Sequence, residues 1–258
     1  MVKSIAVVTG AAGDIGRAIV ARLSDSHDLV VLTDIDEAAL HNAIRLVGSD
    51  DRFIPIVCDV TDAKSVADMA RRIDGLGVVH TLVNNAGAAH AVSLHDTDQA
   101  IWRADSALNL EAPFIVFRAL EHSLKQSKGS VVNIASVNGM AVFGHPAYSA
   151  AKAGLIHLTR LIAVEYGKFG IRANAVAPGT VRTQAWEARA AANPSVFEEV
   201  KRWYALQRIA TAEDVANAVA FLASDQASAI TGTCLPVDCG LTAGQTELAH
   251  TFSQSDNY

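Results

Sequence analysis

The chain has 258 residues, half of them hydrophobic, with a formal net charge of −6 and three cysteines. No run of about 18 residues is free of charged or strongly polar side chains, so no membrane span is expected. No cluster of Lys and Arg suits nucleic acid or anionic lipid, which leaves a small molecule as the expected partner. The cysteines, Cys58, Cys234 and Cys239, lack paired ligand spacing and predict no metal site.

Short β-branched runs alternate with longer helical patterns along the chain. The runs lie at 4–9, 28–33, 52–57, 80–85, 130–135, 171–177 and 233–238. Strands that alternate with helices pair in parallel, and this apolar density suits a sheet covered on both faces. We expect an α/β fold, a doubly wound parallel sheet of about seven strands, as a single domain over 1–258. The N-terminus has no secretory signal, which predicts a cytoplasmic location.

The first predicted strand ends in TGAAGDIG, residues 9–16, and a helical pattern follows. Glycines in such a turn let the backbone approach a pyrophosphate at the helix N-terminus. Asp34 ends the second strand, where a carboxylate accepts the hydroxyls of an adenosine ribose. A 2′-phosphate would be repelled there, and neither Gly13 nor Ile35 supplies a cation, so NAD is favoured over NADP. Alternatively, Asp34 and Asp36 only begin the next helix.

Tyr148 and Lys152 stand four residues apart in AYSAAKAGL, a spacing that makes them neighbours on a helix. A nearby cation favours the phenolate and would lower the tyrosine pKa from about 10. Tyr148 is therefore a candidate proton-transfer group. A core tyrosine beside a surface lysine would produce the same pattern.

Two segments near the C-terminus are less regular. The connection over about 180–206 contains Trp186, Phe197 and Trp203 among many charges, and its length predicts a lid over the site. An amphipathic helix pair would explain the same aromatic residues. The polar tail over about 241–258 is expected to be mobile or to lie against a neighbouring subunit.

Several motifs, in this order, resemble those of the short-chain dehydrogenases/reductases. They are the glycine turn, CDV at 58–60, NNAG at 84–87, NIAS at 133–136, YSAAK at 148–152, APGTVRT at 177–183 and ITG…VDCG at 230–240. The resemblance implies a Rossmann-like fold and makes Tyr148 the general acid/base. It also implies that Lys152 lowers the tyrosine pKa, that Ser136 holds the substrate oxygen, and that Asn109 supports a water chain to the lysine.

The resemblance also implies a cofactor site and a substrate pocket. The cofactor-binding residues, including those of the glycine turn and the second strand, are Gly10, Gly13, Asp14, Ile15, Gly16, Asp34, Ile35, Asp59, Val60, Asn85, Ala86, Gly87, Tyr148, Lys152, Pro178, Gly179, Val181 and Thr183. The substrate-pocket residues are Ser136, Asn138, His145, Tyr148 and Trp186. Further polar candidates are His90, Arg182, Gln184 and Arg189. Such polarity suits a sugar, a polyol or a small hydroxy or keto acid.

Three positions carry expectations of their own. Asp14 replaces a glycine of the family pattern, which costs Coulomb energy near a pyrophosphate unless the carboxylate points away and caps its helix. Cys239 stands where the family prefers glycine, and we expect a minor effect. Pro113 has no N–H to donate to the Asn109 carbonyl, which predicts an irregular helix there and a carbonyl free to bind water.

These features together predict an NAD-dependent secondary-alcohol dehydrogenase or ketone reductase. A second possible enzymatic function is that of an NADPH-dependent 3-oxoacyl-(acyl-carrier-protein) reductase. A non-enzymatic alternative is an NAD-binding sensor or scaffold. The small side chains from Ala147 to Gly154 allow a second helix to approach closely. Family members commonly pair this helix across a two-fold axis, so we expect a homotetramer, with a dimer as the alternative.

Overall fold

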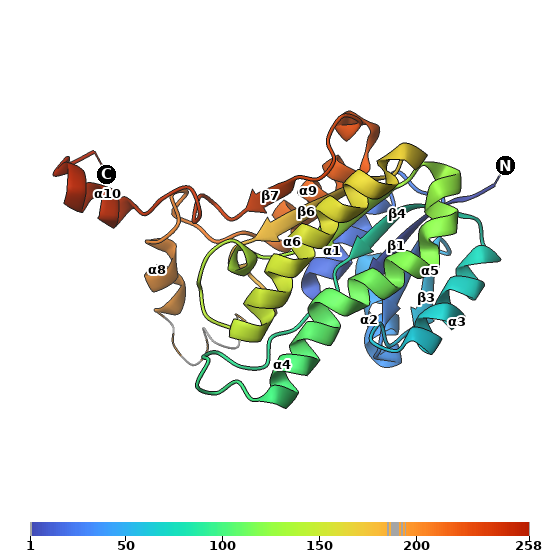
Figure 1. Ribbon diagram of the computed structural model, residues 1–258, viewed down its shortest axis with the longest axis horizontal. Helices are drawn as coiled ribbons and strands as arrows, with labels where there is room; N and C mark the ends of the chain where they lie inside the picture. The colour runs from blue at the N-terminus through green and yellow to red at the C-terminus, as the bar shows by residue number, and fades with distance from the viewer. Residues whose placement is uncertain (1, 185, 187–190, 192, 194, 258) are drawn as a thin grey trace.

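The computed structural model describes residues 2–184, 186, 191, 193 and 195–257. Within them, seven parallel strands form one sheet in the order β3-β2-β1-β4-β5-β6-β7 (Figure 1). The strands are β1 (Ser4–Thr9), β2 (Leu29–Asp34), β3 (Phe53–Val57), β4 (Val78–Asn84), β5 (Ser130–Ile134), β6 (Arg172–Pro178) and β7 (Cys234–Val237). The expected sheet is confirmed, and its largest boundary difference is at β4, which begins at Val78 rather than at 80.

Helices cover both faces of the sheet. One face packs against α1 (Asp14–Leu23), α2 (Glu37–Val47) and α9 (Ala212–Ala223). The other packs against α3 (Ala63–Asp74), α5 (Ala112–Ser127) and α6 (Pro146–Tyr166). The described residues also form the shorter helices α4 (Gln99–Ser106), α8 (Val196–Lys201) and α10 (Thr246–Ser253). Every helix within the described residues is too short or too polar to cross a bilayer.

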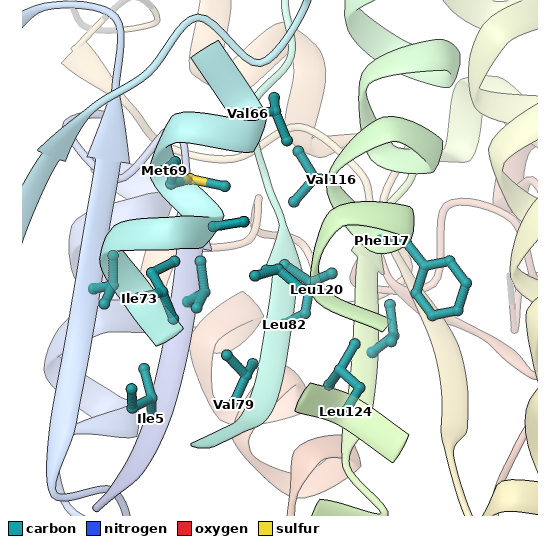
Figure 2. Close-up of a cluster of buried hydrophobic side chains, with 14 of the residues drawn as sticks. Ile5, Val66, Met69, Ile73, Val79, Leu82, Val116, Phe117, Leu120 and Leu124 are labelled. Carbon is teal, nitrogen blue, oxygen red and sulfur yellow. The ribbon is translucent and has the colours of Figure 1, made fainter. Parts of the chain in front are cut away.

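The core beneath α3 and α5 shows why these helices hold their positions. Figure 2 shows Val66, Met69 and Ile73 of α3 facing Leu120 and other residues of α5 above the sheet. Leu120 is 1% exposed, and burying such a side chain stabilises the fold by about 1.5–3 kcal/mol. This packing fixes the strands whose carboxyl ends carry the candidate site.

Helix starts account for several acidic residues. The Asp36 carboxylate accepts the Ala39 N–H at 3.0 Å and caps α2. Asp34 instead ends β2, so the two aspartates that the sequence left ambiguous have different positions. In the same way, Asp62 caps α3. Each carboxylate satisfies an N–H that the first helical turn leaves without a partner.

The helix before Pro113 is irregular, as its missing N–H predicts. Residues Ala107–Glu111 form a π-helical turn between α4 and α5. The Ala112 N–H donates to the Ala107 carbonyl, five residues back. Because proline cannot continue the α-helical ladder, the register slips by one residue at this point. The slip includes Asn109, which is fully buried.

The sheet order reverses between β1 and β4, the point at which parallel α/β sheets bind ligands beyond the strand ends. The glycine turn after β1 and the loop after β4 both lie there. At the opposite end of the chain, Figure 1 shows α10 beyond β7, away from the sheet. The polar tail therefore includes one helix. Its role, the lid and the single-domain boundary all stay predictions.

Candidate active site

The turn after β1 brings the backbone close to the loop after β4. Gly10 has a φ of +61°, and a Cβ at this position would lie 2.7 Å from the Ala86 Cα. A Cβ on Gly16 would lie 2.3 Å from the Gly10 carbonyl oxygen. Gly13 caps α1 without a side-chain acceptor, which leaves the first N–H groups of the helix to the cleft. A side chain at Gly10 or Gly16 would clash with the backbone, and the turn suits an anion.

Thr9 and Asn85 hold the two loops together. The Thr9 hydroxyl accepts the N–H groups of Asn85 and Ala86, each at 3.0 Å. The Asn85 amide donates to the Gly10 carbonyl at 2.9 Å. Thr9 was not predicted as a site residue, although it is the last residue of β1. Its position at a strand end was the available signal.

Asp14 departs from one sequence expectation. It is the first residue of α1 and does not cap the helix, because Gly13 occupies the cap position. Its carboxylate forms an ion pair with Arg17 and accepts the Gln184 N–H at 2.8 Å. Arg17 reduces the Coulomb cost that the sequence predicted, and this partner was missed despite its i, i+3 spacing.

The cleft beside this turn has a volume of about 620 Å³. Asp34 ends β2 at one end of it, where its carboxylate accepts the Ala12 N–H at 3.2 Å and the Ile35 N–H at 2.8 Å. The predicted cofactor residues that line the cleft are Gly10, Gly13, Asp14, Ile15, Gly16, Asp34, Ile35, Asp59, Val60, Asn85, Ala86, Gly87 and Thr183. Among its described lining residues there are three carboxylates and no Lys or Arg.

The other predicted cofactor residues lie outside this lining. Pro178 ends β6, and the Gly179 N–H donates to the Val237 carbonyl at 3.1 Å. Val181 forms an isolated parallel bridge with Ala210. These contacts fasten the start of the 180–206 connection to the carboxyl end of the sheet.

Ser136, Tyr148 and Lys152 meet where β5 ends beside α6. The Ser136 hydroxyl lies close enough to the Tyr148 phenol to influence its pKa. The Lys152 Nζ lies 5.4 Å from the centroid of the Tyr148 ring and donates to the Ile134 carbonyl at 2.7 Å. Lys152 is 3% exposed. The alternative interpretation, a core tyrosine beside a surface lysine, is therefore wrong.

The pKa directions differ from the sequence expectation. Burial raises the pKa of Tyr148 above its ordinary value, the nearby Ser136 hydroxyl opposes this rise, and the charge of Asp105 adds to it. Burial also lowers the pKa of Lys152 to about 7. The predicted lowering of the tyrosine pKa is therefore wrong for this geometry. Desolvation is the largest cause of both shifts.

Asn109 faces the same region from the π-helical turn. Its amide group donates to the Ala88 carbonyl at 2.8 Å and to the Asp105 carbonyl at 2.9 Å. Its Oδ1 is buried and has no hydrogen-bond partner among the described residues. A Cβ on Gly87 would lie 2.7 Å from this oxygen and 3.2 Å from the Lys152 Nζ. An unsatisfied acceptor and a buried ammonium thus border the same glycine.

Two predicted substrate-pocket residues lie near Tyr148. The His145 ring centroid is 6.4 Å from that of Tyr148, and its Nδ1 is 2.9 Å from the Ala91 carbonyl oxygen. Asn138 accepts a hydrogen bond from Ser136 at 3.3 Å and donates to the Gly144 carbonyl at 3.0 Å. Asn138 therefore supports the loop before α6 as well as bordering Ser136.

The remaining predicted pocket residues belong to the 180–206 connection. The ring centroids of Trp186 and Phe197 of α8 are 6.3 Å apart. The Arg182 guanidinium lies 5.4 Å from the centroid of the Phe197 ring. Gln184 contacts Asp14 through its backbone. Arg189 lies outside the described residues. The structure thus joins Ser136, Asn138, His145 and Tyr148, and places Trp186 in a separate aromatic contact.

Sequence reasoning missed Asp105, a buried carboxylate of α4. Its Oδ1 lies 2.5 Å from the Nδ1 of His90. It stands one helical turn before Asn109, and this i, i+4 spacing was the signal available in the sequence. Across the described residues, no three His, Cys, Asp or Glu side chains gather around a possible metal position.

Comparisons with known proteins identify the family of this chain. A family model described as enoyl-(acyl carrier protein) reductase matches residues 10–242. The cis-4-hydroxycyclohexanecarboxylate dehydrogenase of Sinomonas cyclohexanicum is 40% identical, over 93% of this chain and 97% of that protein. The meso-2,3-butanediol dehydrogenase of Serratia marcescens is 36% identical, over 93% and 95% of the two chains.

A solved structure is similar over the whole chain. The crystal structure of an oxidoreductase of the short-chain dehydrogenase/reductase family from Burkholderia thailandensis has a TM-score of 0.92 and 45% identity, covering 100% of both chains. The fold and the relatives make this protein an oxidoreductase of alcohols or other hydroxy compounds that uses a nicotinamide dinucleotide. The chain belongs to the short-chain dehydrogenase/reductase family.

Proposed function

We propose that this protein is an NAD-dependent dehydrogenase of secondary alcohols, or a reductase of the corresponding ketones. The observation that carries the proposal is the meeting of Ser136, Tyr148 and Lys152 beside the dinucleotide cleft. A phenol, a hydroxyl and an ammonium in this arrangement can hold an alcohol oxygen and move its proton.

The residues present fit a dinucleotide. Gly10 and Gly16 leave backbone space that a Cβ would fill, and the first turn of α1 offers N–H groups to a pyrophosphate. The unsatisfied Asn109 Oδ1 and the buried Lys152 Nζ both border the position that a Cβ on Gly87 would fill. There, Oδ1 would accept a hydrogen bond from a ribose hydroxyl or a water, and Nζ would donate one. When bound, the nicotinamide accepts or supplies the hydride.

The protein's own groups handle the proton. In the oxidising direction, the substrate hydroxyl gives its proton to the Tyr148 phenolate oxygen. The Ser136 hydroxyl donates a hydrogen bond to the same substrate oxygen and stabilises the charge that develops there. The Lys152 Nζ lies 5.4 Å from the centroid of the Tyr148 ring, and when this amine is protonated its charge favours the phenolate. In the reducing direction, the phenol returns the proton to the substrate oxygen.

Charge supports NAD as the cofactor rather than NADP. The cleft contains the carboxylates of Asp14, Asp34 and Asp59, and Lys and Arg are absent from its described lining. The two or so negative charges of a 2′-phosphate beside Asp34 would be repelled without compensation. Ile35, at 66% exposure, offers no cation where one would be needed.

For the substrate, we propose a hydroxylated compound such as a polyol, a sugar, or a small hydroxy or keto acid. The polar groups of Asn138, His145 and His90 border the reaction centre and the cleft. The names of two relatives, a hydroxycyclohexanecarboxylate dehydrogenase and a butanediol dehydrogenase, describe substrates within this range.

We also propose a homotetramer, with a dimer as the alternative. Large apolar side chains stand exposed on α4, α5 and α6, among them Trp102 at 43%, Phe114 at 48% and Val164 at 84%. Burying such residues between copies removes apolar area from water. Light scattering coupled to size-exclusion chromatography tests this, and a monomer at working concentrations would contradict it.

Turnover assays test the function. The purified protein is incubated with NAD or NADP and a panel of polyols, sugars, hydroxy acids and simple alcohols, and absorbance of the reduced cofactor is followed. We expect oxidation of at least one secondary alcohol, with NAD preferred. Turnover of a 3-oxoacyl thioester with NADPH would support the acyl reductase instead. NAD binding without turnover on the whole panel would support the non-catalytic sensor.

A further inference from the structure

The loop that leaves β4 carries His90, and two contacts fasten this loop to the start of the catalytic helix α6. The His145 N–H donates to the Val92 carbonyl at 3.2 Å, and the His145 Nδ1 lies 2.9 Å from the Ala91 carbonyl oxygen. His145 holds a left-handed conformation with φ of +53° to make both contacts. The loop that carries His90 is thereby held beside Tyr148.

Asp105 fixes the His90 ring. Its side chain is 1% exposed, and its Oδ1 lies 2.5 Å from the His90 Nδ1. A carboxylate can only accept, so Nδ1 carries the hydrogen, and in the neutral ring Nε2 keeps its lone pair. A buried carboxylate costs free energy unless it is paired. Because the imidazole is the partner of Asp105, this cost favours the orientation in which the two side chains stay paired.

His90 borders the ligand cleft. The His90 side chain is 51% exposed and lines the same cleft as Gly87 and Thr183. Within the described part of the chain, Nε2 has no hydrogen-bond partner. Asp105 is also close enough to Tyr148 for its charge to raise the pKa of that phenol, which places the His90–Asp105 pair near the reaction centre.

We propose that His90, oriented by Asp105, is a specificity-determining residue whose Nε2 accepts a hydrogen bond from a ligand hydroxyl in this cleft. The hydroxyl belongs to the substrate, as the second hydroxyl of a vicinal diol or polyol, or to a ribose of the cofactor. This inference rests on the proposed function, because it concerns selection at the same site. Asp105 acts as a positioning residue, since it touches His90 and not the ligand.

Two variants separate this role from simple fastening of the loop to α4. His90→Asn places an amide N–H near the position of Nδ1, so it can still donate to Asp105 but lacks Nε2. His90→Gln carries a polar atom near the position of Nε2. His95→Asn changes an exposed histidine of the same connection and serves as the control.

The first measurement is the ratio of kcat/KM for 2,3-butanediol to that for 2-butanol, with NAD. If the substrate hydroxyl is recognised, the ratio falls about five- to tenfold in His90→Asn, the effect of one hydrogen bond between neutral groups, and recovers in part in His90→Gln. The ratio should not change in His95→Asn. Asp105→Asn should lower it as well, because the imidazole loses its orientation.

The second measurement is the Kd for NADH by fluorescence, without substrate. If a ribose hydroxyl is recognised, Kd rises about five- to tenfold in His90→Asn while the diol ratio stays constant. If the wild type oxidises alcohols and neither quantity moves, the inference is wrong and the proposed function stands. If the wild type oxidises nothing, the proposed function fails and the NADH measurement alone decides the inference.

Discussion

The carboxylate of Asp14 accepts the backbone N–H of Gln184 at 2.8 Å, which joins the glycine turn of the cofactor cleft to the chain that follows β6. The same carboxylate pairs with Arg17. A residue that replaces a glycine of the family pattern therefore connects the start of α1 to the connection predicted as a lid. Two effects of Asp14 oppose each other, since it fastens this connection but also places a negative charge near the pyrophosphate position.

Asp14→Asn separates the two effects. The amide oxygen can still accept the Gln184 N–H, but the negative charge is gone and Arg17 has no ion-pair partner. We expect NADH to bind about two- to threefold more tightly, as removal of one partly screened repulsion allows. Fluorescence titration of NADH measures this, with Asp14→Ala as the variant that loses both effects. Weaker binding in Asp14→Asn would show that the ion pair matters more than the repulsion.

Cofactor preference should depend on Asp34 and Ile35. Asp34→Asn keeps an acceptor for the Ala12 N–H, and Ile35→Arg adds a cation at an exposed position. Together they should raise kcat/KM for NADP relative to NAD by about 100-fold, because one repulsion is removed and a charge-assisted hydrogen bond is added. Ile35→Ala is the matched control. An unchanged ratio in the double variant would mean that other residues select the cofactor.

The sheet and the motif positions were predictable from the sequence because both follow from local patterns. Runs of β-branched residues marked each strand to within two residues, and Pro113 marked the π-helical turn. Glycine spacing marked the cleft. In each case, the residue type alone limits what the backbone can do at that position.

Pairings between distant residues were not predictable. Nothing in the sequence shows that Asp105 meets His90 or that Asp14 reaches Gln184, because these contacts depend on how loops lie in space. The pKa of Tyr148 was predicted in the wrong direction for a similar reason. Spacing shows that a cation is near, but only the packed structure shows how completely Lys152 is desolvated.

Burial of Lys152 should give the fold a distinct pH dependence. Its pKa falls from 10.5 to about 7, so between these values the unfolded chain binds more protons and this residue's contribution to stability rises with pH. Below the lower value, both states are protonated and the full burial penalty remains. The free energy of unfolding of Lys152→Met minus that of the wild type should therefore shrink from pH 7 to pH 10, by roughly 3 kcal/mol. Urea titrations across this range measure the difference. A difference independent of pH would contradict the shift.

Cys239 should destabilise the fold slightly. It has a φ of +51°, a left-handed conformation that costs a residue with a Cβ about 1–2 kcal/mol. Cys239→Gly removes this cost but gains entropy in the unfolded chain, worth about 0.4–1 kcal/mol. We expect a net stabilisation of up to about 1 kcal/mol in thermal or urea unfolding. Clear destabilisation would show that packing of the thiol outweighs the backbone strain.

The central claim is that the Tyr148 phenol exchanges a proton with the substrate oxygen while Ser136 holds that oxygen. Because only the phenolate accepts a proton, kcat/KM for oxidation in the wild type should increase as pH rises toward the pKa of Tyr148. The most direct measurement compares wild type with Tyr148→Phe, which removes one oxygen and keeps the ring beside Lys152. We predict that kcat falls by about 10²–10⁴-fold, the usual contribution of general acid–base catalysis, while the Kd for NADH stays within about twofold. A Tyr148→Phe enzyme that keeps its kcat, and with it the rise of activity with pH, would contradict this mechanism.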